Sequence, residues 1–186
     1  PLCKRCGREK SEYCNFCRES MFFFEQARAY GHYHGVLKEI IHEFKYKGKR
    51  DLALFLGDKI YNVYKNTSWP FIDFIIPVPL HKKRFRERGF NQSLLLAKVL
   101  SQKTKIPVLD VLQRIKPTKQ QVRLSRKSRR ENMKNVFKIN LKDNLYNKTL
   151  ILVDDVYTTG TTVNECAKTL KKAGAREIYV ITIARG

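Results

Sequence analysis

Apolar side chains recur at helical spacing in several stretches of the chain. Between residues 51 and 64, for example, Leu52, Leu56 and Ile60 would share one face of a helix. Gly174 stands just beyond another such stretch, where helices commonly end in the left-handed conformation. The helices predicted on this basis span residues 35–45, 51–64, 91–104 and 162–173.

Short apolar runs between these helices predict strands. The strongest is the run from Leu150 to Val153, which is typical of a parallel strand buried on both faces. Strands that alternate with helices indicate an α/β fold with a doubly wound, mostly parallel sheet, in which a ligand lies at the carboxyl ends of the strands. The other predicted strands span residues 22–30, 72–78, 107–112, 136–139 and 178–183.

The chain carries a large positive charge. Its 186 residues include 38 Lys and Arg against 17 Asp and Glu, which gives a formal net charge of +21. The basic residues cluster at 82–88 and 114–138, and each of these segments contains a single acid. This excess is larger than solubility requires and indicates a phosphate-bearing partner, with solvated basic faces as the alternative.

Length and hydropathy limit the classes of protein that fit. The length suits one domain with a small appendage. No apolar run approaches the ~18–20 residues that cross a bilayer, and no secretory leader opens the sequence. We therefore expect a soluble, cytoplasmic protein without a transmembrane segment.

Four of the five cysteines form two closely spaced pairs near the start of the sequence, Cys3 with Cys6 and Cys14 with Cys17. Two Cys-x2-Cys pairs can complete the tetrahedral shell of a structural zinc site. Disulfides fit less well because they need a secreted context, and a redox motif would need one pair only. The segment has too few apolar residues to fold without a metal. We expect residues 1–20 to form a zinc-binding module, a small zinc finger, beside a larger domain at 21–186.

The segment from Leu150 to Thr162 carries the strongest functional signal. Its strand leads to two carboxylates, Asp154 and Asp155, and then to a hydroxyl-rich turn around Gly160 that opens a helix. Backbone N–H groups in such a turn, together with the positive end of a helix, bind phosphate. The carboxylates suit vicinal hydroxyls or a divalent cation. The segment predicts a sugar phosphate with Mg²⁺, with a purely structural turn as the alternative.

These thirteen residues resemble the loop with which type I phosphoribosyltransferases bind phosphoribosyl pyrophosphate (PRPP). Residues 45–48, 76–80 and 88–92 are similar to the signature of the ComF family of competence proteins, and so are the spaced residues between 121 and 137. The four cysteines belong to the same pattern. On these motifs the chain is identified as a member of the ComF family, and it is also similar to the transferase half of glutamine amidophosphoribosyltransferase.

The resemblance implies a PRPP site that uses Mg²⁺. Asp154 and Asp155 would contact the ribose hydroxyls as the catalytic pair, the turn at 158–162 would hold the 5′-phosphate, and a loop at 80–84 would grip the pyrophosphate. The basic segment 114–129 would be the mobile loop over the site. The residues implied to bind PRPP are Leu80, His81, Lys82, Lys83, Arg84, Asp154, Asp155, Val156, Tyr157, Thr158, Thr159, Gly160, Thr161 and Thr162.

The family is associated with the uptake of transforming DNA, which gives the basic residues a second interpretation. We predict a PRPP-binding protein of natural competence that handles incoming single-stranded DNA, peripheral to the inner membrane through other competence proteins. The alternative is an active phosphoribosyltransferase with an unidentified acceptor and no DNA role. The residues expected to bind DNA are Arg88, Arg123, Arg126, Lys127, Arg129 and Arg130.

Overall fold

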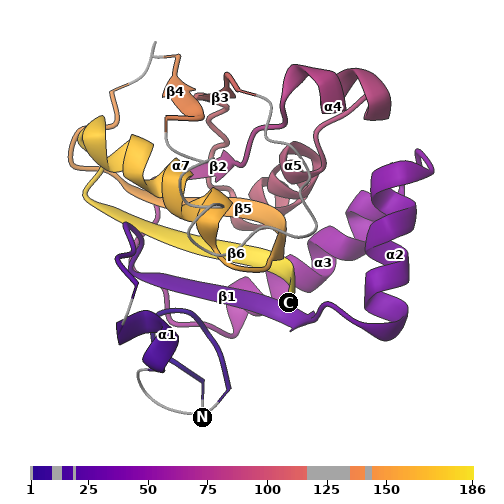
Figure 1. Ribbon diagram of the computed structural model, residues 1–186, viewed down its shortest axis with the longest axis horizontal. Coiled ribbons are helices and arrows are strands. Elements are labelled where there is room, and N and C mark those ends of the chain that lie inside the picture. The colour runs from indigo at the N-terminus through magenta and orange to yellow at the C-terminus, as the bar shows by residue number, and fades with distance from the viewer. Residues whose placement is uncertain (1, 10–13, 19, 117–134, 141–143) are drawn as a thin grey trace.

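A four-stranded parallel sheet forms the centre of the protein. The computed structural model describes residues 2–9, 14–18, 20–116, 135–140 and 144–186. The strands lie in the order β1-β6-β5-β2 (Figure 1). Their bounds are β1 Gln26–His32, β6 Glu177–Arg185, β5 Thr149–Tyr157 and β2 Phe74–Pro77.

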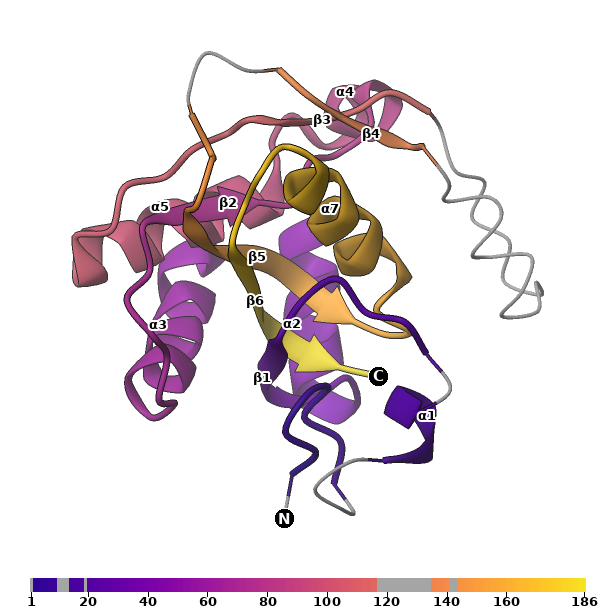
Figure 2. The same cartoon turned by 90° about the vertical axis from the view of Figure 1, so that its left-hand side faces the viewer.

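Helices cover both faces of this sheet (Figure 2). Apolar residues alternate along β5, so that Ile151 packs with the helices of one face and Leu152 with the helix of the other. The predicted doubly wound α/β fold is therefore confirmed. The helices of the first face are α2 Gly35–Tyr46, α3 Leu52–Lys65 and α5 Gln92–Thr104, and the second face is covered by α7 Thr161–Lys172.

A separate two-stranded sheet lies beside α7. It pairs β3 Leu112–Arg114 with β4 Phe137–Ile139 in antiparallel orientation. The strand predicted at 107–112 is wrong over most of its length, because Val108 makes only an isolated bridge to Ile75. The strand at 136–139 exists, but it pairs with β3 and so adds nothing to the main sheet.

Two differences from prediction affect the site. Strand β5 continues to Tyr157, because its pairing with β6 extends as far as the Tyr157–Arg185 register pair, so both aspartates are strand residues. The segment expected as a loop at 80–84 runs into helix α4, Lys82–Arg88. His81 caps α4 by accepting a hydrogen bond from the Lys83 N–H at 3.2 Å, and Gly89 ends it with a φ of 75°.

The cysteine-containing segment docks on the edge strand β1, and it includes the short helix α1 Asn15–Arg18. The Ala27 N–H donates to the Arg5 carbonyl at 2.6 Å, and Arg28 Nη1 donates to the Lys4 carbonyl at 3.1 Å. The first of these bonds uses a backbone N–H that an open sheet edge would leave unpaired. The division into units at residue 20 stays a prediction.

In the parts of the chain that the structure describes, no helix is long and apolar enough to span a membrane.

Candidate functional site

The two aspartates near the carboxyl end of β5 lie in a pocket of about 400 Å³. Thr158 and Thr162 line the same pocket from the turn that follows β5. This is the edge at which ligands bind in parallel α/β sheets. The structure therefore brings together the acid pair and the turn that the sequence singled out.

Hydrogen bonds and an ion pair fix the acid pair. The Asp155 N–H donates to Asp154 Oδ1 at 2.9 Å, and the Ser93 hydroxyl donates to the same oxygen at 3.0 Å. Lys45 Nζ lies 2.8 Å from Asp155 Oδ1, with the two side chains 15% and 13% exposed. The lysine thus neutralises one of two adjacent carboxylates in a poorly hydrated site.

This environment shifts the pKa of Asp154 and that of Lys45. Burial and the neighbouring Asp155 raise the pKa of Asp154 to about 7, against the lowering effect of Lys45. Burial tends to lower the pKa of Lys45, but the two aspartates outweigh it and raise that pKa overall. The Asp154 carboxyl therefore keeps its proton up to near neutral pH.

Three guanidinium groups from two elements complete the wall of the pocket. Arg84 and Arg88 come from α4, and Arg114 comes from β3. Burial and the nearby Arg84 lower the pKa of Arg114. Arg88 lies over the ring of Tyr46, with its Cζ 4.7 Å from the centroid. This side of the pocket is suited to an anion with several charges.

The expected pyrophosphate-binding residues do not all meet here. Leu80 and Arg84 line the pocket. Lys82 instead lines an adjacent cavity of about 320 Å³, His81 caps α4, and Lys83 is exposed. Successive side chains of a helix point in different directions. Residues 80–84 therefore contribute to both the pocket and the adjacent cavity.

The turn at residues 158–162, which we call the phosphate loop, has a fixed internal geometry. The hydroxyls of Thr159 and Thr161 lie 2.8 Å apart, and Gly160 takes a φ of 74° immediately before α7. Val156 lines the pocket, whereas Tyr157 is 2% exposed and lies in the core. Tyr157 therefore supports the loop from below and does not line the pocket.

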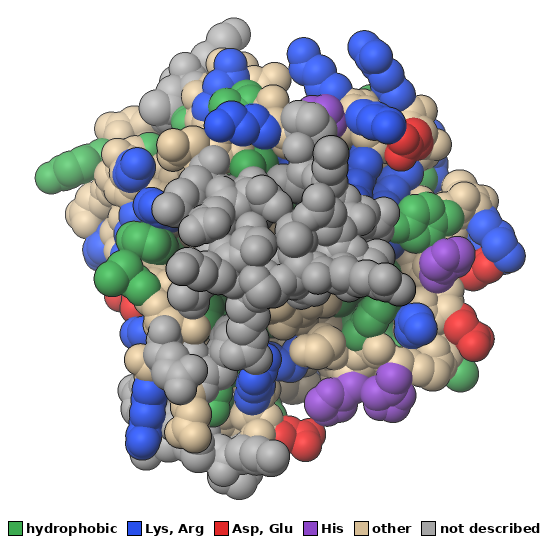
Figure 3. Space-filling view, in the orientation of Figure 1, with side chains coloured by type: hydrophobic (Ala, Val, Ile, Leu, Met, Phe, Trp, Pro, Cys, Tyr) green, Lys and Arg blue, Asp and Glu red, His purple; other side chains and the backbone are tan. Residues whose placement is uncertain are grey.

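Among the residues expected to bind DNA, Arg88 lies at the pocket just described. The other expected DNA-binding residues, Arg123, Arg126, Lys127, Arg129 and Arg130, lie outside the described residues. Figure 3 shows Lys and Arg side chains gathered around α4, at the upper right of that view.

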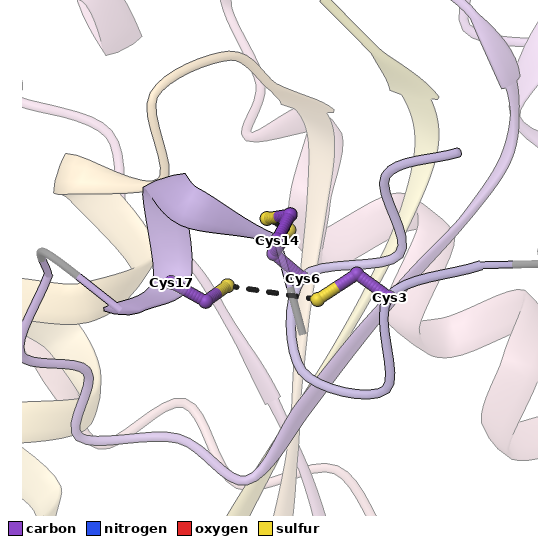
Figure 4. A group of neighbouring side chains, drawn as sticks. All are labelled: Cys3, Cys6, Cys14 and Cys17. Carbon is purple, nitrogen blue, oxygen red and sulfur yellow. Dashed lines mark hydrogen bonds between the residues drawn. The ribbon is translucent and has the colours of Figure 1, made fainter. Parts of the chain in front are cut away.

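The four amino-terminal cysteines converge on one point (Figure 4). All four Sγ atoms lie within 4.8 Å of one another; Cys3 and Cys17 are 3.7 Å apart, and Cys6 and Cys14 are 3.5 Å apart. A tetrahedral Zn–S shell with bonds of about 2.3 Å needs sulfur separations of about 3.8 Å. These residues, the cysteine cluster, therefore fit a structural metal site.

The pKa of one thiol in the cluster is already suited to metal binding. Burial tends to raise the pKa of Cys3, but hydrogen bonds from the backbone of Cys14, Cys6 and Arg5 lower it to about 6. Metal ligation requires the thiolate form. The backbone thus favours the ligating state of Cys3, whereas burial raises the pKa of Cys6 and of Cys17.

Sequence reasoning missed several residues of the pocket. Lys45 falls in the family motif at 45–48 but was assigned no role from it, and Ser93 gave no signal beyond its place near a helix start. Tyr33 also lines the pocket. Only the packing of α2 and α5 against the sheet brings these side chains to β5.

The chain is similar to several known proteins. A family model described as "Phosphoribosyl transferase domain" matches residues 91–186. Competence protein F of Haemophilus influenzae is 37% identical over 194 residues, which cover 100% of this chain and 85% of the relative. DNA utilization protein YhgH of Escherichia coli (strain K12) is 30% identical over 192 residues, covering 99% and 84%.

Two further proteins are similar to this chain. Competence protein ComFC of Bacillus subtilis (strain 168) is 30% identical over 196 residues, covering 99% of this chain and 78% of the relative. Among solved structures, the glutamine PRPP amidotransferase of B. subtilis complexed with ADP and GMP has a TM-score of 0.48 and 21% identity. That match covers 71% of this chain and 26% of the other.

Proposed function

Because the chain belongs to the phosphoribosyl transferase domain family, and within it to the ComF family of competence proteins, we propose that it is a PRPP-binding protein of natural competence. One observation carries this proposal. An acid pair, a phosphate loop at a helix start and three guanidinium groups line one pocket. Each group matches a different part of one phosphorylated sugar.

The phosphate loop would hold the 5′-phosphate of PRPP. Its backbone N–H groups and the amino end of α7 favour an anion. Thr158 and Thr162 line the pocket and add hydroxyl donors. The acid pair Asp154 and Asp155 would accept hydrogen bonds from the ribose hydroxyls.

The pyrophosphate would lie toward Arg84 and Arg114, and Mg²⁺ bound with it would neutralise part of its charge. If the protein catalyses transfer, pyrophosphate leaves the anomeric carbon as the C–O bond breaks, and the acceptor forms the new bond. These guanidinium groups would then stabilise the charge that develops on the leaving group. The side chains would thus position PRPP and neutralise the charge of the leaving group, and no covalent nucleophile would be needed.

The role in competence would include handling incoming single-stranded DNA at the cytoplasmic side of the inner membrane. The names of the relatives, which refer to competence and DNA utilization, support this part of the proposal. The net charge of +21 also supports it, because one PRPP needs only a few cations. Arg88, stacked on Tyr46, joins the pocket to the basic surface of α4.

Two measurements on one sample test the proposal. Calorimetry measures PRPP binding in the presence of Mg²⁺, and a coupled assay measures pyrophosphate release with single-stranded DNA, ammonia or nucleobases added. We expect PRPP to bind. Release that depends on one acceptor would identify a transferase, and binding without release would identify PRPP as a ligand of a DNA-handling protein. Failure to bind PRPP would overturn the proposal.

A further inference from the structure

Arg185, the last residue of β6, lies between the cysteine cluster and the phosphate loop. Its side chain is 8% exposed. Its Nη1 donates a hydrogen bond to the carbonyl oxygen of Cys6. Its Cζ lies 4.8 Å from the centroid of the Tyr157 ring. One guanidinium thus contacts both a cysteine-bearing turn and the residue before the phosphate loop.

The Tyr157 ring fills the space directly beneath Gly160. A Cβ atom added to Gly160 would lie 2.6 Å from Tyr157 Cζ and would also collide with the Tyr157 hydroxyl oxygen. Gly160 is therefore required both for its positive φ and for this close approach. The position of the Tyr157 ring therefore limits how closely the phosphate loop can approach the core at Gly160.

The turn that contains Cys6 is itself held against the sheet. A Cβ at Gly7 would lie 2.8 Å from the Ala27 carbonyl oxygen and 3.7 Å from Arg185 Nη1. Gly7 has a φ of 71°. The turn therefore packs tightly on β1, and the Cys6 carbonyl reaches Arg185 only while the turn keeps this shape.

Packing alone does not account for Arg185. Its Nη2 and the Tyr157 hydroxyl are buried without a hydrogen-bond partner within the described residues. Leaving such groups unpaired in the core is costly, and an apolar side chain of similar size would avoid that cost. A cationic, planar group at this position is better explained by its contacts with the Cys6 carbonyl on one side and the Tyr157 ring on the other.

We propose that Arg185 and Tyr157 are positioning residues that hold the phosphate loop in the geometry required for the 5′-phosphate, and that the metal-bound cysteine cluster fixes Arg185. The proposal rests on the proposed PRPP site for its ligand. It predicts that disturbing the cysteine cluster weakens the phosphate end of the site and spares the pyrophosphate end.

The test compares Arg185→Met with Arg28→Met as the matched control. Arg28 also donates to carbonyls of the first cysteine turn, at 3.3 Å to Cys3 and 3.1 Å to Lys4, whereas it is the Arg185 guanidinium that lies over the Tyr157 ring. Two probes separate the ends of the site: ribose 5-phosphate for the phosphate loop and pyrophosphate with Mg²⁺ for the other wall. Calorimetry measures both affinities.

Arg185→Met should lower the affinity for ribose 5-phosphate about tenfold, which is the effect of one lost positioning contact. It should change the affinity for pyrophosphate by less than about twofold. Arg28→Met should leave both affinities near wild type. Equal losses of affinity for both probes, no loss at all, or the same loss in an Arg28→Met protein that keeps its metal would each overturn the proposal.

A second readout needs no ligand. Hydrogen exchange of the backbone amides at 158–162 should be faster in Arg185→Met, and also in the wild-type protein after a chelator removes its metal. If Arg185→Met does not fold, Arg185→Lys, which keeps a donor but loses the planar face, replaces it. Unchanged exchange would overturn the positioning role, whereas wild-type protein that binds no probe would overturn the PRPP site itself.

Discussion

Lys45, in the last turn of α2, places its Nζ 2.8 Å from Asp155 Oδ1 in strand β5. Asp154 immediately precedes Asp155 in the strand, and both acids line the pocket. The lysine therefore acts as an internal counter-ion for an acid pair that would otherwise repel itself.

Replacing Lys45 with Met should destabilise the protein by about 3 kcal/mol at pH 8, because it leaves a poorly hydrated carboxylate without its partner. At pH 6 the loss should be smaller, since a proton can then neutralise the acid pair. Urea unfolding at the two pH values measures this. The control is Lys103→Met, which breaks an exposed pair with Asp58 and should cost about 0–1 kcal/mol. Equal effects of the two changes would contradict the role given to Lys45.

The raised pKa of Asp154 predicts a specific pH dependence of stability. In the unfolded chain Asp154 ionises near its ordinary pKa of 3.8, whereas in the fold it holds its proton up to about pH 7. Between these values the folded state binds more protons, so this carboxyl makes the fold less stable as the pH rises, by up to about 1.4 kcal/mol per pH unit.

Asp154→Asn removes this titration. The difference in unfolding free energy between variant and wild type should therefore change in favour of the variant from pH 5 to pH 7 and level off above about pH 8. A difference that stays constant across this range would show that the carboxyl is not buried as described.

Asp154→Ala and Asp155→Ala should each lower PRPP affinity by about a hundredfold or more, because the ribose hydroxyls lose a charged acceptor. The domain should stay folded. Asp73→Ala is the matched control, since Asp73 accepts hydrogen bonds from the Thr149 N–H and Lys148 at the other end of β5. It should reduce stability without changing PRPP affinity. Wild-type affinity in either pocket variant would refute the assignment.

Single-stranded DNA should bind without sequence preference, and its log affinity should fall with log salt at a slope of about −0.7 per phosphate contacted. Reversing the charge of Arg126, Lys127, Arg129 and Arg130 together should reduce the slope. Filter binding across salt concentrations measures it. Binding that is insensitive to salt would exclude the basic segments as the DNA surface.

Metal analysis should find one zinc ion per chain. Cys3→Ser should lose the ion and lower the unfolding temperature, because the thiolate shell supplies folding energy. Cys166→Ala is the control: Cys166 is a buried core residue of α7 and is not one of the four residues of the cysteine cluster, so this change should leave the zinc content intact. A full complement of zinc in Cys3→Ser would contradict the site.

The sequence predicted the parallel α/β fold well, because its main strands and helices have strong local patterns. The run from Leu150 to Val153 identified the central strand, and the spacing of Leu52, Leu56 and Ile60 identified α3. The family was also recognised from local motifs. These features share one property, which is that neighbouring residues carry the whole signal.

What the sequence did not predict depends on packing or on weak local preferences. Helix α4 buries none of its residues, so it has no apolar spacing to detect. The pairing of β3 with β4 brings together two short strands separated by a long segment. The contacts of Asp154 with Ser93 and of Asp155 with Lys45 arise only when α5 and α2 pack against the sheet.

The makeup of α4 has a consequence for its behaviour in solution. The helix is maintained at its ends by His81 and Gly89, and like charges four residues apart, such as Lys82 with Arg86, oppose it from within. Its local opening free energy is therefore set largely by ionic strength and by anions, unlike that of the sheet. A polyanion that screened these charges would stabilise the helix, so that its binding and the local ordering of α4 would be thermodynamically linked.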